Sequence, residues 1–261
     1  MKKNNLVIDI GNTHIVMGVC IGDNLVDSRR ISTDLSKTED EYYVIIKNLL
    51  SDIISLDKIS NIGLSSVVPS VTRVFDHLIK KYMKRKPIIV TANTDLGLHF
   101  SIKNPETIGA DLLVNAFAAK EIYKKNAIVC DLGTATTIQL IGKNGKFYGT
   151  AIIPGIVTSA DSLFKKASLL SDIRLEKPKN ILGTNTKDAL LTGILRGHAF
   201  LLDGFINEIK KDFSQLEDIL VIATGGMSPM VYELSSNIDV VDKNLTLHGL
   251  NIIANNSTQI D

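Results

Sequence analysis

Two short segments of the chain repeat a combination of residues that can bind phosphate. The first contains Asp9, Gly11, Asn12 and Thr13, and the second, at 131–136, reads DLGTAT. In each, a carboxylate ends an apolar run and is followed by a glycine turn with hydroxyl side chains. Glycine lets backbone N–H groups approach a phosphate, hydroxyls add hydrogen bonds, and carboxylates hold the accompanying metal ion. This residue combination predicts two phosphate-binding turns.

The segments around these turns, residues 6–20 and 127–141, share the order strand, Asp, glycine turn, strand. We interpret each as a β-hairpin, and their repetition predicts a chain with two similar halves. Two ordinary hairpin turns are the alternative, but a carboxylate in both copies favours a shared site. We expect Asp9 and Asp131 to face each other across a cleft and to hold Mg²⁺, Asp9 through water.

A third candidate is ATGG at 223–226, an apolar run followed by two glycines. A planar adenine or a ribose could lie against the backbone there, because glycine has no side chain. The motif is weak by itself, since strand-to-helix turns often contain glycine. With it, the residues predicted to bind ATP or its phosphates are Asp9, Gly11, Asn12, Thr13, Gly133, Thr134, Thr136, Gly225 and Gly226.

The elements that position these turns alternate between strand and helix patterns. Thr38 and Glu41 form a capping box, Pro69 can open a helix, and Ser228-Pro229 can cap and start another. The pattern predicts an α/β fold with two domains, 1–115 and 116–261, separated by a cleft. Further strands are predicted at 59–68, 87–91 and 219–224, and helices at 38–50, 69–82, 106–124 and 186–213.

Composition limits the class of protein. Apolar residues make up 44% of the 261 positions and the net charge is +1, so no basic field favours nucleic acid or a membrane surface. The N-terminus lacks a signal-peptide core, and we expect a cytoplasmic protein. Cys20 and Cys130 lie in apolar runs and are interpreted as reduced core thiols. The five histidines show no zinc-ligand spacing: His14, His77, His99, His198 and His248.

Taken together, the motifs resemble those of type III pantothenate kinases. Asp9–Thr13 and Asp131–Thr136 are similar to the phosphate motifs of that family, and Thr224-Gly225-Gly226 is similar to its adenosine motif. The resemblance follows the family order over nearly the whole chain. Further matching segments are Ser65–Pro69, Asn104-Pro105, Gly109-Ala110-Asp111 and Ile153-Pro154-Gly155.

This resemblance implies an actin-like, ribonuclease H-like duplicated fold, with mixed sheets flanked by helices and an inter-domain cleft. It implies a homodimer that uses ATP and Mg²⁺ to phosphorylate pantothenate to 4'-phosphopantothenate, the first step of coenzyme A synthesis. A monovalent cation, K⁺ or NH₄⁺, would bind at Asp131. Asp111 would be the general base, and the pantothenate site would comprise Gly109, Ala110, Asp111 and, from the neighbouring subunit, Thr186.

Several of these residues have a purely structural alternative. Asp111 could simply favour the start of a helix, and Thr186 could be a helix N-cap. Gly193, Gly197 and Gly204 lie in one long predicted helix, where glycine is costly. Close packing explains them, either at a dimer interface or within the chain.

The sequence departs from the family pattern on the acceptor side. Leu112 stands where the family has an arginine that faces the pantothenate carboxylate, and leucine has no donor. Arg196 or Lys103 could replace it only if the fold brings them close. Two lesser departures are Thr150 at a usual glycine and Ile102 near a usual tyrosine. The alternatives are therefore a weak or inactive member acting as a binding or regulatory protein, or a kinase with another small acceptor.

Overall fold

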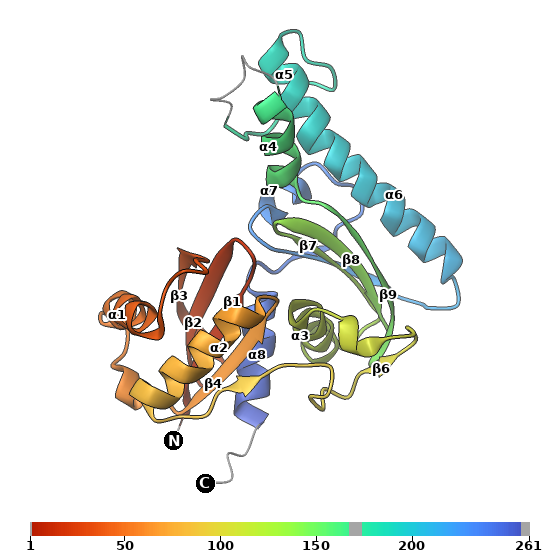
Figure 1. The fold of residues 1–261 in the computed structure, drawn as a ribbon. Coiled ribbons are helices and arrows are strands. Elements are labelled where there is room, and N and C mark those ends of the chain that lie inside the picture. Colours follow the sequence, from red (N-terminus) through yellow and green to blue (C-terminus); the bar gives the residue numbers. More distant parts are fainter. Residues whose placement is uncertain (1, 167–173, 257–261) are drawn as a thin grey trace. The chain divides into compact units, whose positions relative to one another are not determined.

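A computed structural model describes residues 2–166 and 174–256. The chain divides into two compact units, each organised around one mixed β-sheet (Figure 1). Within the described residues, the first unit comprises 2–98, 103–118 and 245–256, and the second comprises 99–102, 119–166 and 174–244.

The first sheet has five strands in the order β3-β2-β1-β4-β5. Strands β1 and β2 form an antiparallel hairpin, β3 continues it, and β4 and β5 add parallel to β1 and β4. Val7 and Ile8 of β1 are fully buried, since both faces of this central strand are covered. The strands are β1 (Asn4–Ile10), β2 (His14–Ile21), β3 (Asn24–Ser32), β4 (Asn61–Ser66) and β5 (Ile88–Ile89).

The second sheet has six strands in the order β11-β10-β7-β8-β9-β6. It repeats the plan of the first: β7, β8 and β9 are antiparallel neighbours, and β10 and β11 add parallel on the other side of β7. The predicted duplication and α/β fold class are thus confirmed. The strands are β6 (His99–Phe100), β7 (Ala127–Leu132), β8 (Ala135–Ile141), β9 (Lys146–Pro154), β10 (Leu220–Thr224) and β11 (Val240–Val241).

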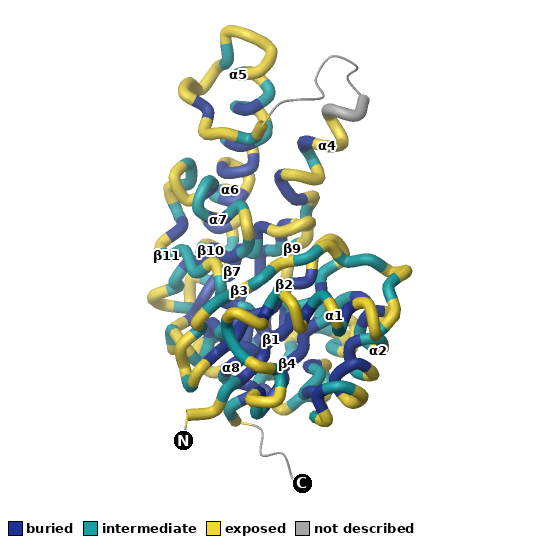
Figure 2. Tube along the Cα trace, turned by 90° about the vertical axis from the view of Figure 1, so that its left-hand side faces the viewer, coloured by how far each residue is buried: buried dark blue, intermediate teal, exposed yellow. Residues whose placement is uncertain are grey.

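Helices cover both faces of the first sheet. α1 (Glu39–Leu50) begins at the predicted capping box, in which Thr38 N donates to the Glu41 carboxylate at 2.8 Å, and α2 (Pro69–Leu78) begins at its proline. Both helices contribute to a core with β1 and β4, which are dark blue in Figure 2. α8 (Leu245–Asn256) covers the other face, and α3 (Ala110–Ala118) packs closely on Gly249 of α8. Single 3₁₀ turns lie at Leu56–Lys58 and Pro105–Thr107.

The second unit contains the longest helical segment. α5 (Thr186–Leu191), a π-helical turn (Thr192–Arg196) and α6 (Gly197–Asp212) follow one another, as predicted for 186–213. By length and composition this segment could cross a membrane, a test that core helices also pass. One side is buried in the core of the second unit, so the segment packs on that core. The buried residues of that side are Leu191, Leu195, Ala199, Leu202 and Ile206.

Shorter helices complete the second unit. α4 (Ile156–Lys166) follows β9, and α7 (Ser228–Tyr232) follows β10. The predicted cap at Ser228 is wrong, because Ser228 is the first helical residue and its hydroxyl donates to the Gly225 carbonyl at 2.8 Å. Two further π-helical turns, Ile79–Met83 and Ala119–Tyr123, extend α2 and α3.

Both cysteines are free thiols in the cores, as predicted. Cys20 on β2 and Cys130 on β7 are fully buried. Burial raises the pKa of each thiol to about 12, since a thiolate is disfavoured away from water. The reactive thiolate form is therefore suppressed at neutral pH.

Candidate active site

The turn between β7 and β8 presents an open tip. Asp131 is partly buried near the end of β7, and Gly133 and Thr134 are exposed beyond it. Gly133 N donates to the Ala135 carbonyl at 3.1 Å, which closes the turn. The nearest atom to a Cβ added at Gly133 would be 3.6 Å away, so packing does not require glycine here. The missing side chain leaves the surface over the turn open, as a phosphate-binding turn needs.

The start of α4 holds this tip from one side. Gly155 N and Thr158 Oγ1 both donate to the Thr134 carbonyl, at 3.1 and 2.6 Å. A Cβ at Gly155 would lie 2.5 Å from the Thr134 carbonyl oxygen and 2.4 Å from the Gly133 carbonyl oxygen. Only glycine fits at position 155, which gives the Ile153-Pro154-Gly155 motif a packing role.

The turn after β10 holds the tip from another side. Thr224 pairs in register with Asp131 across the parallel β10–β7 pair. Gly225 has a φ of 87°, and a Cβ there would lie 2.6 Å from Asp131 Oδ1 and 2.7 Å from the Leu132 carbonyl oxygen. Glycine is required at position 225 by both conformation and space. Gly226 follows and is exposed. The second unit thus brings together the predicted residues Asp131, Gly133, Thr134, Thr136, Gly225 and Gly226.

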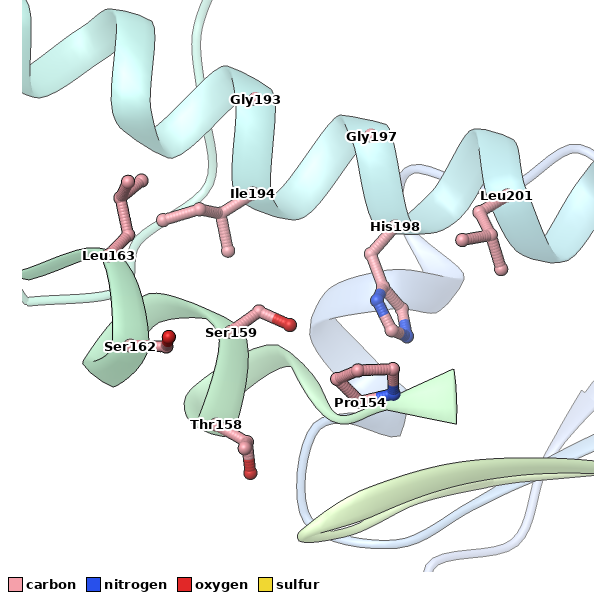
Figure 3. A pocket seen from close by; sticks show the side chains of 10 residues that line it. All are labelled: Pro154, Thr158, Ser159, Ser162, Leu163, Gly193, Ile194, Gly197, His198 and Leu201. Atoms are coloured by element: carbon pink, nitrogen blue, oxygen red, sulfur yellow. The ribbon is translucent and has the colours of Figure 1, made fainter. Parts of the chain in front are cut away.

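Thr136 connects this turn to a pocket. Its hydroxyl is buried and lies 3.0 Å from His198 Nε2, in a hydrogen bond between β8 and α6. Burial lowers the pKa of His198, which favours the neutral ring. His198 lines a pocket of about 700 Å³ between α4 and the long helical segment, together with Thr158, Ser159 and Ser162 (Figure 3). Sequence reasoning missed His198, because its partner is distant in the sequence.

The first hairpin has a turn of the same type in the first unit. Asp9 is partly buried near the end of β1, and Asn12 and Thr13 are exposed. Gly11 N donates to the His14 carbonyl at 2.9 Å. Thr33, just after β3, holds the turn: its hydroxyl donates to the Gly11 carbonyl at 2.6 Å and its N–H donates to the Thr13 carbonyl at 2.9 Å.

Asp111 lies in the first turn of α3, in the first unit. Its Oδ1 accepts from Leu112 N at 2.8 Å, and burial raises the pKa of its carboxyl. A Cβ at Gly109 would collide with that Oδ1 and lie 3.3 Å from Val67 Cγ1, so Gly109 makes room for the carboxylate beside the segment after β4. Ala110 is buried. Gly109, Ala110 and Asp111 therefore form one compact feature.

Asp9 and Ser65 lie at the same edge of the first sheet as this feature. They are register partners near the carboxyl ends of the parallel strands β1 and β4. Ser65 is fully buried, and its Oγ has no hydrogen-bond partner within residues 2–166 and 174–256. Sequence reasoning gave Ser65 only as part of a family motif. Its register with Asp9 places a second side-chain oxygen at this edge.

The structure also shows where Thr186, Leu112 and Thr150 lie. Thr186 is exposed at the start of α5, but Asn185 is the N-cap and its Oδ1 accepts from Asp188 N at 2.9 Å. The N-cap alternative for Thr186 is therefore wrong. Leu112 is buried, and Thr150 is exposed without a positive φ. Arg196 Nη2 donates to the Pro178 carbonyl at 3.5 Å.

Comparison with known proteins gives one family and one fold. A family model described as type III pantothenate kinase matches residues 5–208. A Campylobacter jejuni protein described as a Baf family transcriptional activator is 19% identical, with a TM-score of 0.56 over 95% of this chain and 96% of that one. A ROK family glucokinase from Streptomyces griseus, in complex with glucose and AMPPNP, is 12% identical, with a TM-score of 0.57 over 97% and 100%.

The fold similarity extends to another class of protein. The activator of 2-hydroxyisocaproyl-CoA dehydratase from Clostridium difficile, with bound ADPNP, is 11% identical, with a TM-score of 0.58 over 96% of this chain and 94% of that one. These likenesses establish the actin-like fold that the sequence motifs implied.

Proposed function

The chain belongs to the type III pantothenate kinase family, and we propose that it transfers the γ-phosphoryl group of ATP to the primary hydroxyl of pantothenate in the cytoplasm. The product would be 4'-phosphopantothenate, the first intermediate towards coenzyme A. The observation that carries this proposal is the tip of the second hairpin, where Gly133 is free of packing constraints while Gly155 and Gly225 are required by packing. A turn that neighbouring segments hold in place, and that carries no side chain on its exposed surface, suits a phosphate group.

ATP would contact residues of both hairpins. Backbone N–H groups and hydroxyls of the two turns would hold its phosphates, and the Gly225-Gly226 turn would support the adenosine. Asp9 fits an Mg²⁺ ion held through water, and Asp131 fits a monovalent cation, because carboxylate oxygens are the ligands that such hard cations prefer. When bound, these cations neutralise the charge on the phosphates.

Asp111 would act as the general base. Burial raises the pKa of its carboxyl, which makes the carboxylate a stronger proton acceptor than an ordinary aspartate. It would take the proton of the pantothenate hydroxyl as that oxygen attacks the γ-phosphorus and ADP leaves. Phosphoryl transfer depends mainly on positioning and charge stabilisation, so one base is sufficient.

The test is pantothenate-dependent ADP release with Mg-ATP and K⁺, with Asp111→Asn as the control. Turnover that the control abolishes is the expected result. A folded protein that releases no ADP with pantothenate would favour the second candidate, a binding or regulatory protein without kinase activity. The buried Leu112 favours that candidate, because it offers the substrate carboxylate no donor. The net charge of +1 argues against direct nucleic-acid binding in either case.

Leu112→Arg tests the acceptor side separately. A charge-assisted contact is worth about 1.5–3 kcal/mol, so the variant should lower the KM for pantothenate by about tenfold or more. Because position 112 is buried, the variant should also unfold at a lower temperature. If the wild type turns over poorly and this variant does not improve it, the missing arginine is not the limiting defect, and another small acceptor becomes the better hypothesis.

We also propose that the outer side of the long helical segment forms the homodimer surface. Phe200 is 54% exposed and Phe205 is 37% exposed. Apart from the helix's own backbone, Cβ atoms added at Gly193, Gly197 or Gly204 would meet no atom within 4 Å, so close packing within the described chain does not explain these glycines. Gly193 and Gly197 also line the pocket beside α4. A second copy would use the close approach that they allow, and Thr186 could then reach the pantothenate of the partner subunit.

Light scattering on a Phe200→Asp, Phe205→Asp double variant tests this surface. The variant should be monomeric and inactive, while the wild type should be a dimer. A matched control is Tyr232→Asp on α7, which replaces another exposed aromatic residue, 46% exposed, and should remain dimeric. A double variant that is still dimeric would place the interface elsewhere.

A further inference from the structure

The register pair next to the turn differs in kind between the two hairpins. In the first hairpin, Ile10 of β1 pairs with Ile15 of β2, and both side chains are fully buried in the hydrophobic core of the first unit. In the second hairpin, the pair at the same place is Leu132 of β7 and Thr136 of β8. A hydroxyl group therefore stands where the first copy of the motif has an apolar core side chain.

Thr136 faces the core of the second unit. Side chains alternate between the two faces of a strand, and Ile138 and Leu140 of the same strand belong to that core. Thr136 is 0% exposed, whereas Gly133 and Thr134 at the tip of the turn are exposed. The Thr136 hydroxyl therefore lies inside the core and not on the open surface of the turn.

His198 of α6 supplies the partner that this buried hydroxyl needs. Its Nε2 lies 3.0 Å from Thr136 Oγ1. Burial lowers the pKa of His198, so the ring stays neutral at neutral pH and offers one N–H and one unprotonated nitrogen. Leu195, Ala199 and Leu202 of the same helical segment belong to the apolar core. The imidazole and the hydroxyl are thus a polar pair within an otherwise apolar contact between β8 and the long helical segment.

Packing alone does not require this pair. Two apolar side chains of similar shape would fill the space without the cost of burying an imidazole and a hydroxyl, as Ile15 does in the first hairpin. A hydrogen bond adds direction, because it is satisfied only over a narrow range of distance and angle, whereas apolar contacts are non-directional. A directional contact next to the tip fixes how β8 leaves the turn.

His198 acts on the turn together with α4. Thr158 of α4 donates to the Thr134 carbonyl at 2.6 Å, and Thr158 and His198 line the same pocket (Figure 3). Thr134 and Thr136 lie on either side of Ala135, whose carbonyl accepts from the turn and closes it. The closing residue is therefore flanked by one residue bonded to α4 and one bonded to α6.

We propose that His198 is a positioning residue, which holds the second hairpin turn in its phosphate-binding conformation through the hydrogen bond to Thr136. The inference rests on the proposed function, in which backbone N–H groups of this turn contact the phosphates of ATP. Backbone groups cannot move independently of the turn, so a small displacement of the turn weakens all of their contacts together. Thr136 acts in the same way, through the turn and not by touching the phosphate.

The test compares two properties of each variant, the affinity for a non-hydrolysable ATP analogue by calorimetric titration and the unfolding temperature. His198→Phe should bind the analogue about three- to tenfold more weakly, because one hydrogen bond that holds the turn is lost. It should also unfold at a lower temperature, because the Thr136 hydroxyl is left buried without this partner. His198→Gln should bind within about twofold of the wild type, since a carboxamide also carries a donor and an acceptor.

The double variant Thr136→Val, His198→Phe separates positioning from stability. It replaces both polar groups by apolar ones, so its unfolding temperature should return close to that of the wild type. Its affinity for the analogue should stay about three- to tenfold weaker, because the directional contact is still missing. A matched control is Ile206→Val on the buried side of α6, which should lower the unfolding temperature and keep the wild-type affinity.

Three results would overturn the inference. Wild-type affinity in the double variant would show that the pair only stabilises the fold, while ATP binding, and with it the proposed function, stands. If the double variant does not fold, equal affinities of His198→Phe and His198→Gln would have the same meaning. Absence of ATP-analogue binding by the wild type would overturn the proposed function, and this inference with it.

Discussion

The two hairpins have the same strand order but hold their turns in different ways. The turn of the first hairpin, β1–β2, is held by Thr33 through two hydrogen bonds from a segment that follows β3. The turn of the second hairpin, β7–β8, is wedged between Gly155 and Gly225, where no side chain fits. Hydrogen bonds hold the turn in both copies, from Thr33 in the first and from Gly155 N and Thr158 Oγ1 in the second, and the second copy adds close backbone packing against Gly155 and Gly225.

This difference separates two uses of glycine that look alike in the sequence. A Cβ at Gly133 would have its nearest contact at 3.6 Å, an ordinary distance, so tight packing does not dictate this glycine, whereas a Cβ at Gly11 would lie 3.2 Å from the His14 carbonyl oxygen, a tight contact. Gly155 and Gly225 are dictated by tight packing. We infer that Gly133 serves the approach of a ligand, whereas Gly155 and Gly225 serve the shape of the site.

The largest effect is expected from Asp111→Asn in the first unit. Losing a general base should lower kcat by about 10²- to 10⁴-fold. The KM for ATP should stay unchanged, because the residues proposed to hold ATP lie in the two hairpins and in the Gly225-Gly226 turn. Steady-state kinetics with both substrates varied separately measure the two quantities. A matched control is Asp95→Asn, which removes a carboxylate from an exposed loop of the same unit and should have wild-type kinetics.

The next effect is expected from Gly155→Ala in the second unit. The added Cβ would lie 2.5 Å from the Thr134 carbonyl oxygen, so the backbone must shift, and overpacking of this kind costs about 3 kcal/mol. The unfolding temperature should fall by roughly 6–12 °C for a chain of this size. Gly225→Ala should behave similarly, because strain at a φ of 87° adds to its contacts. If Gly155→Ala and Gly133→Ala unfolded at the same temperature, the conclusion that packing requires glycine at 155 but not at 133 would be wrong.

The hairpins and helix starts could be predicted from the sequence, whereas the close packing of Gly155 and Gly225 around the second turn could not. The hairpins, the capping box at Thr38 and Glu41, and the helix that starts at Pro69 depend on neighbouring residues, and the structure has them. The packing of Gly155 against Thr134 depends on residues far apart in the chain. Sequence patterns that report periodicity and turns carry no signal for such contacts.

The same limit applies to the candidate site. Residue spacing located the glycine and aspartate motifs of the hairpins, but neither spacing nor family resemblance gave a reason why Gly155 and Gly225 must be glycine. Both also missed the His198–Thr136 hydrogen bond. These features arise where a strand face or a helix meets a distant partner, which the spacing of residues within one element cannot reveal. Ser228 was assigned the wrong role, because its hydroxyl donates backwards into the turn that precedes α7.

A smaller effect is expected from Gly133→Ala. The turn can accept the methyl group without a shift, so the unfolding temperature should change by less than that of Gly155→Ala. The methyl group would occupy the space in front of the turn, and the KM for ATP should rise about tenfold as one phosphate contact is weakened. Calorimetric titration with an ATP analogue measures the affinity directly. Unchanged affinity would remove Gly133 from the proposed phosphate site.

The smallest effect is expected in the pH dependence, which links Asp111 to both activity and stability. Burial raises the pKa of this carboxyl. The loss of kcat at acidic pH should therefore have its midpoint above the ordinary aspartate pKa of about 3.9. The contribution of this carboxyl to folding stability changes with pH in the opposite direction from its contribution to activity. A raised folded-state pKa means that the protonated form stabilises the fold below the unfolded-state pKa, and that this contribution is lost as the pH rises through the folded-state pKa.

Activity and the stability contribution of Asp111 should therefore move in opposite directions across the same pH window. The measurement is kcat and urea-unfolding free energy as functions of pH, for the wild type and for Asp111→Asn. The difference in stability between the two proteins should favour the asparagine variant increasingly as the pH rises through the acidic limb of wild-type kcat. If that difference is constant while kcat titrates, the titrating group is another residue, and the base of the reaction would have to be sought outside the first turn of α3.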